Sequence, residues 1–118
     1  NREFVAIASE LQPLKSLGVY HCGTLPIGGE ALPEGSPFVP SPKSQELLLG
    51  YFGKSARQPT HVVVVNLDYR NAVTTTLVGP GPMEVFHTPT KSWTGGSSGK
   101  RLSLDLPPGG GVLVRVKR

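Results

Sequence analysis

The sequence predicts an all-β fold, a two-sheet antiparallel β-sandwich of about 6–8 strands with a short N-terminal helix and a Pro-rich connection. Short apolar runs of strand length recur along residues 45–118, and turns rich in glycine or proline separate them. The 15 glycines and 12 prolines follow no fixed period, which excludes a collagen-like chain. The 118 residues fit one domain, spanning 1–118.

Residues 1–16 predict the short amphipathic helix. Phe4, Ile7 and Leu11 recur at helical spacing. Pro13 limits the helix, because an interior proline removes a backbone donor and clashes with the preceding turn. The apolar face must pack against either this sandwich or a preceding domain.

Residues 23–44 predict a long Pro- and Gly-rich connection, which follows a brief strand at 17–22. Its prolines are too frequent for a central strand or a helix. We therefore expect an extended segment, rich in polyproline II conformation, that packs single apolar side chains onto the domain or across an interface.

Residues 45–118 carry the main strands. The valines from Val62 to Val65 suit a strand that is buried on both faces, whereas Leu102, Leu104 and Leu106 alternate with polar residues. The last two strands, joined through residues 107–111, predict a closing hairpin. In order, the expected strands are 46–53, 61–68, 72–78, 83–87, 101–106 and 111–117.

The charge pattern disfavours a nucleic-acid partner. The chain has a net charge of +4 and a pI near 9.5, but its Lys and Arg residues are scattered singly among turns and strands, which is typical of a solvated surface. No apolar run approaches the roughly 18 residues that a membrane span requires, so no membrane partner is predicted. The single cysteine, Cys22, cannot form an internal disulfide.

The sequence predicts no metal site and no cofactor. The candidate ligands are His21, Cys22, His61 and His87, but His21 and Cys22 are adjacent on an expected strand and should point to opposite faces. Residues 95–100 superficially match a phosphate-binding loop. The spacing is one residue short and a strand follows where a helix is needed, so a hairpin loop is the better interpretation.

No catalytic residue is predicted either. Hydrolysis of a glycoside needs two carboxyl groups about 5–10 Å apart. The acidic candidates are Asp68, Glu84 and Asp105, and no pattern sets any two of them opposite each other. No serine lies in a nucleophile elbow.

Carbohydrate binding needs less, namely aromatic ring faces flanked by a few polar groups. The candidate carbohydrate-binding residues are Trp93, Tyr51 and Tyr69. Trp93 is expected at the tip of a hairpin, where it is either an exposed platform or a plug folded over the edge of the sandwich. We favour the plug.

Three motifs together resemble a known family. Residues 47–52 read LLLGYF, residues 64–68 read VVNLD, and residues 106–116 read LPPGGGVLVRV. This set, within residues 45–116, resembles the C-terminal β-sandwich of bacterial multidomain glycoside hydrolases. The resemblance implies an accessory domain that stabilises or spaces a catalytic barrel or binds carbohydrate, because the catalytic carboxylates of that family lie in the barrel.

The sequence therefore predicts a non-catalytic accessory module of a glycoside hydrolase, with polysaccharide binding as an added role. Phe4, Ile7 and Leu11 would then face the catalytic barrel as the partner domain. The family also implies an extracellular or periplasmic location. The alternatives are a purely structural or protein-interaction sandwich and, less favoured, an independent glycoside hydrolase.

Overall fold

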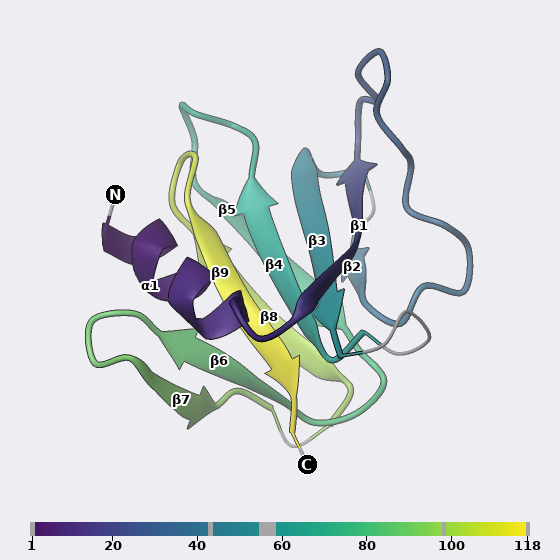
Figure 1. The fold of residues 1–118 in the computed structure, drawn as a ribbon. Coiled ribbons are helices and arrows are strands. Elements are labelled where there is room, and N and C mark those ends of the chain that lie inside the picture. Colours follow the sequence, from purple (N-terminus) through teal and green to yellow (C-terminus); the bar gives the residue numbers. More distant parts are fainter. Residues whose placement is uncertain (1, 43, 55–58, 98, 118) are drawn as a thin grey trace.

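A computed structural model describes residues 2–42, 44–54, 59–97 and 99–117, with the side chains of the helix described from Ile7 onward. In it, a short N-terminal helix precedes a two-sheet antiparallel sandwich (Figure 1), as the sequence predicted. The described residues form six strands in one sheet and three in the other, more than the 6–8 strands expected. The molecule measures 33 × 31 × 27 Å. The elements are α1 (Arg2–Leu11), β1 (Lys15–Cys22), β2 (Val39–Ser41), β3 (Leu47–Gly53), β4 (His61–Asn66), β5 (Val73–Val78), β6 (Met83–His87), β7 (Ser92–Gly95), β8 (Arg101–Leu106) and β9 (Gly111–Val116).

The larger sheet has the strand order β1-β3-β4-β9-β6-β7, and the smaller has the order β2-β5-β8. Side chains from both sheets meet in one core. Its fully buried members include Phe38, Leu47, Leu49, Val62, Val64, Leu77, Met83 and Val114. No helix in the described part of the chain is long and apolar enough to span a membrane.

Two strands lie where the sequence predicted none. β2 lies within the Pro-rich connection and pairs with β5 through only three residues. Its position at the edge of the sheet explains how Pro40 is tolerated, because an edge strand needs hydrogen bonds on one side only. β7 pairs with β6 and places Trp93 directly opposite Phe86, so Trp93 lies within a strand and not at the tip of a hairpin.

The predicted closing hairpin is wrong. β8 pairs with β5 in the smaller sheet, whereas β9 lies between β4 and β6 in the larger sheet. The turn at 107–110 therefore carries the chain from one sheet to the other. Leu113 and Val114, adjacent on β9, are both fully buried, so this strand needs cover on both faces. β8 buries only its leucines, on one face, and lies at the edge of the smaller sheet.

The cover on the outer face of the larger sheet is α1. Ile7 packs with Phe86 and Leu113 in a second apolar cluster, and Leu11 and Val63 border it. Burial of β4 on both faces is thus partial: Val62 and Val64 point into the sandwich, and Val63 and Val65 on the outer face are only half-buried.

The expectation that Ile7 faces a partner domain is wrong, because Ile7 is buried against the sheet of its own chain. Leu11 is half-buried at the border of the same cluster, and a catalytic barrel as partner stays a prediction. An amphipathic helix docks on the nearest apolar surface, and β9 offers one. The side chain of Phe4 lies outside the described residues.

Candidate functional site

The loops that follow β4 and β8 are joined by a buried asparagine. The Asn66 side chain donates from Nδ2 to the carbonyl oxygens of Asn71 at 2.9 Å and Pro107 at 3.1 Å. Its Oδ1 accepts the backbone N–H of Asp68 at 2.9 Å. The side chain is almost fully buried, so these bonds satisfy an amide that burial would otherwise penalise. Asn66 thereby fixes both loops relative to the sheet.

Asp68 shapes the turn that follows. Its Oδ1 accepts the backbone N–H groups of Arg70 at 2.8 Å and Asn71 at 3.1 Å. The hydrogen bond from the Arg70 backbone, with those from Asn71, lowers the pKa of the Asp68 carboxyl from its usual range. The carboxylate therefore acts as the acceptor that closes this turn.

Tyr69 lies at the outside of the same turn and is 80% exposed. Its ring approaches Gly109, where an added Cβ would lie 2.9 Å from Tyr69 Cδ1. Gly109 also has a φ of 66°, in the left-handed region that favours glycine. The turn at 107–110 thus leaves room for the ring. We call the surface formed by Tyr69, Arg70, Asn71 and Gly109 the loop-end surface.

Tyr51 lies in the core, where only 4% of the residue is exposed. Its hydroxyl donates to the carbonyl oxygen of Phe38 at 2.5 Å, and its ring contacts those of Tyr20 and Phe38. Burial raises the pKa of Tyr51 to about 12. This tyrosine presents no ring face to a ligand in this structure, so we leave it out of the proposed surface.

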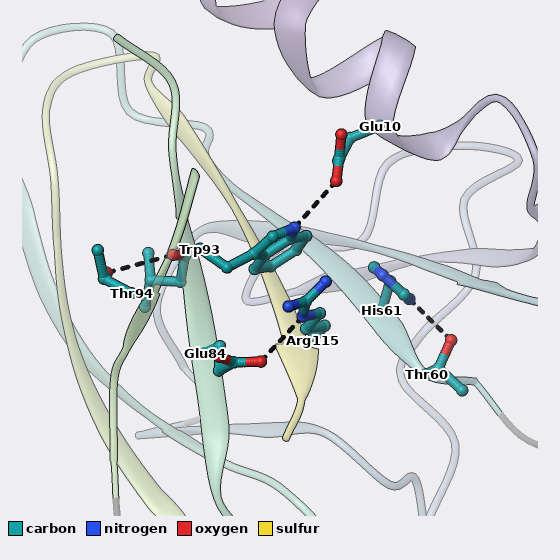
Figure 2. Close-up of polar contacts among 8 residues, drawn as sticks. Glu10, Thr60, His61, Glu84, Trp93, Thr94 and Arg115 are labelled. Carbon is teal, nitrogen blue, oxygen red and sulfur yellow. Dashed lines mark hydrogen bonds and ion pairs between the residues drawn. The ribbon is translucent and has the colours of Figure 1, made fainter. Parts of the chain in front are cut away.

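Trp93 links the helix to the sheet. Figure 2 shows its indole between Glu10 and Arg115, with Nε1 donating to Glu10 Oε1 at 2.9 Å. The guanidinium carbon of Arg115 lies 4.0 Å from the centroid of the indole. Arg115 Nε also donates to Glu84 Oε1 at 3.0 Å. The rings of His61 and Phe86 complete the surroundings.

These contacts engage Trp93 in packing. A cation over the indole face and an acceptor at Nε1 both occupy groups that a sugar would use. The residue is half-buried, so carbohydrate binding by Trp93 stays a prediction.

The structure does not bring the three aromatic candidates together. The Trp93 cluster lies at His61, the first residue of β4, whereas Tyr69 follows Asn66, the last residue of that strand. At roughly 3.3 Å per residue these ends are about 17 Å apart. Tyr51 is opposite Val62, near the His61 end of β4, and its side chain lies in the core. Any sugar platform therefore involves Tyr69 or Trp93 separately.

The acidic candidates are also separate. Glu84 pairs with Arg115 on the outer face of the larger sheet, and Asp105 accepts the Thr74 hydroxyl at 2.8 Å in the smaller sheet. Asp68 closes the turn after β4. Each carboxylate thus has a structural partner of its own.

No group of three His, Cys, Asp or Glu side chains that could hold a metal ion occurs among the described residues. In the pairing of β1 with β3, His21 lies opposite Leu48 and Cys22 opposite Leu47. The Cys22 side chain is buried in the core.

Sequence reasoning missed the roles of Asn66 and Glu46. Glu46 accepts the backbone N–H of Thr24 at 3.0 Å and the Thr24 hydroxyl at 2.8 Å. The hydrogen bond from the Thr24 hydroxyl, and to a lesser extent the one from the Thr24 backbone N–H, lowers the pKa of the Glu46 carboxyl. A polar residue at the end of a valine run was the available signal for Asn66. Nothing in the sequence indicated the pairing of Thr24 with Glu46.

Comparisons with models of protein families, with curated proteins and with solved structures found no significant match. The resemblance to glycoside hydrolase accessory domains therefore rests on the three sequence motifs.

Proposed function

We propose that this chain is a non-catalytic accessory module of a glycoside hydrolase, and that it binds carbohydrate through the loop-end surface. The observation that carries the proposal is that residues of two of the sequence motifs hold the turns around the exposed ring of Tyr69. Asn66 and Asp68 of the VVNLD motif, with Pro107 and Gly109 of the LPPGGG motif, together support the exposed ring of Tyr69. A support of this kind reduces the entropy that a binding residue loses when a ligand docks.

The chemistry of the loop-end surface suits a sugar. The exposed phenol offers an apolar face for the C–H surface of a pyranose and a hydroxyl for hydrogen bonding. Arg70 and Asn71 are exposed beside it and supply polar groups for sugar hydroxyls. An open surface of this type fits a polymer lying across it better than a small ligand that needs a cavity.

The electrostatics of the acidic residues support a non-catalytic role. A glycosidase needs one carboxyl group that stays protonated until it donates to the leaving oxygen. The lowered pKa of the Asp68 carboxyl favours its charged form, which opposes the role of general acid for this residue. Glu84 is engaged in an ion pair with Arg115, with 3.0 Å between Oε1 and Nε.

The proposed role of Tyr69 is tested by co-sedimentation of the chain with a panel of insoluble polysaccharides. We expect at least one polysaccharide to retain the chain. Tyr69→Ala should then weaken binding about tenfold, the loss of roughly 1.4 kcal/mol, whereas Tyr69→Phe should keep most of it. Lys100→Ala, at the other end of the sandwich, is the matched surface control. Retention of full binding by Tyr69→Ala contradicts the proposed site.

Hydrolysis is measured on the same panel. We expect no release of reducing sugar. If the chain releases sugar, and Asp68→Asn, Glu84→Gln or Asp105→Asn abolishes that release, the chain is an independent glycoside hydrolase and the accessory role is wrong.

A further inference from the structure

The loop that follows β1 presents aliphatic side chains to solvent. Ile27 is fully exposed and Leu25 is 50% exposed, with Pro26 between them. In Figure 1 this loop extends beyond the ends of the strands of the sandwich. Its aliphatic tip contributes little to the core of its own chain, and water contact at such groups is unfavourable. We call residues 25–27 the apolar tip.

The loop is held at its base. The Glu46 carboxylate accepts both the backbone N–H and the hydroxyl of Thr24. On the other side, the backbone N–H of His21 donates to the carbonyl oxygen of Glu30 at 2.7 Å. Hydrogen bonds thus tie the loop to β1 and to the residue before β3.

The tip itself is a closed turn. The Gly29 N–H donates to the Pro26 carbonyl oxygen at 2.9 Å, and Gly28 has a φ of 80°. These are features of a type II turn, in which glycine takes the third position. Proline and the turn hydrogen bond restrict the backbone before any partner binds, so ordering this loop on binding costs little free energy.

The segment that carries the tip is acidic. Residues 16–42 contain Glu30 and Glu34 but no Lys or Arg, although the chain as a whole carries +4. Both glutamates are exposed, and the Glu46 carboxylate lies at the base of the loop. A complementary surface would therefore be apolar at its centre and basic at its rim.

We propose that the apolar tip is a docking element for another protein, inserting Ile27 and Leu25 into an apolar pocket bordered by Lys or Arg side chains. Apolar anchors that fill a pocket at the centre of a contact, with polar groups around the rim, are a common arrangement at protein interfaces. This role is independent of carbohydrate binding by Tyr69.

Other occupants fit less well. An anionic lipid surface would be repelled by the glutamates. A second copy of this chain offers basic residues such as Lys15, Lys54 and Lys117, but none of the large exposed apolar residues among those described lies at that end of the sandwich. A copy would thus match the charge of the tip without matching its apolar centre.

The test places the photoreactive residue p-benzoylphenylalanine at position 27, in the full-length protein and in its native cells. Irradiation followed by mass spectrometry identifies the residues captured. We expect a segment of one other protein whose captured site is apolar and bordered by Lys or Arg. The same probe at position 100, at the opposite end of the sandwich, is the control.

Two variants in the probe-carrying chain examine the contact itself. Leu25→Asp should lower the yield of the cross-link at least tenfold, because a carboxylate would enter the pocket. Glu30→Lys should lower it severalfold through repulsion by the basic rim. Both residues are exposed, so the thermal unfolding temperature should stay unchanged.

Four outcomes would overturn the proposal. They are capture of another copy of this chain, capture of lipid or polysaccharide, capture of a protein site without basic residues, and a yield at position 27 no higher than at position 100. Loss of sugar binding in Tyr69→Ala bears on the loop-end surface alone, so the two proposals fail separately.

Discussion

Asn66 shows how a single side chain organises the end of the sandwich. It donates hydrogen bonds to two loops. Asn71 in the first loop is five positions away in the sequence, and Pro107 in the second is 41 positions away. The sequence identified the VVNLD segment as a motif, but the partners of the asparagine come from a turn whose position depends on the sheet order. Its role could not be predicted before the fold was known.

Replacing this residue tests that role. We expect Asn66→Ala to lower the free energy of unfolding by about 3 kcal/mol, because it removes three hydrogen bonds and leaves buried groups without partners. Asn71→Ala removes only an exposed side-chain bond to Asp68 and should cost less than about 1 kcal/mol. Urea unfolding measures both. Equal losses in the two variants would contradict the role of Asn66.

Tyr51 gives the fold a dependence on alkaline pH. Burial raises its pKa from 10.0 to about 12, so the folded state favours the neutral phenol. The resulting stabilisation is complete below pH 10 and is lost as the pH rises through 12. We expect the free energy of unfolding to fall more steeply over this range in the native chain than in Tyr51→Phe. Chemical unfolding at stepped pH measures the difference, and parallel curves would contradict it.

At the scale of the elements, the sequence predicted most strands but not their distribution between the sheets. Alternating leucines on β8 and valines on β9 look alike as strand patterns. The difference lies in Leu113, which occupies the face of β9 opposite Val114 and is equally buried. Only the docked helix explains that burial, and the sequence left the partner of the helix open.

Trp93 holds this helix to the sheet. A helix of ten residues is marginal in isolation, so α1 depends on its docking contacts. We expect Trp93→Ala to lower the free energy of unfolding by about 2–3 kcal/mol. It should also speed hydrogen exchange of the α1 amides. Lys91→Ala, an exposed neighbour before β7, should leave both quantities nearly unchanged. Unchanged helix exchange in Trp93→Ala would mean that Ile7 and Leu11 hold the helix alone.

At the scale of the whole molecule, the two-sheet sandwich followed from the spacing of strands and turns, because that pattern depends on local residues. The candidate site did not follow in the same way. Tyr51, Tyr69 and Trp93 are all aromatic residues in or beside strands, and their sequence positions do not distinguish a core ring from an exposed one. Of these three residues, only Tyr69 has an exposed ring that also packs beside a residue of the sequence motifs, Gly109.

Binding through Tyr69 can be mapped residue by residue. A soluble oligosaccharide, taken from whichever polysaccharide retains the chain, is titrated into the isotopically labelled protein while backbone amide signals are recorded by NMR. We expect the largest chemical-shift changes at the loop-end surface, at Tyr69, Arg70, Asn71 and Gly109. The amide signals of Trp93 and Arg115 should change little. Shifts concentrated at Trp93, or no shift with any oligosaccharide of the panel, would contradict carbohydrate binding at this surface.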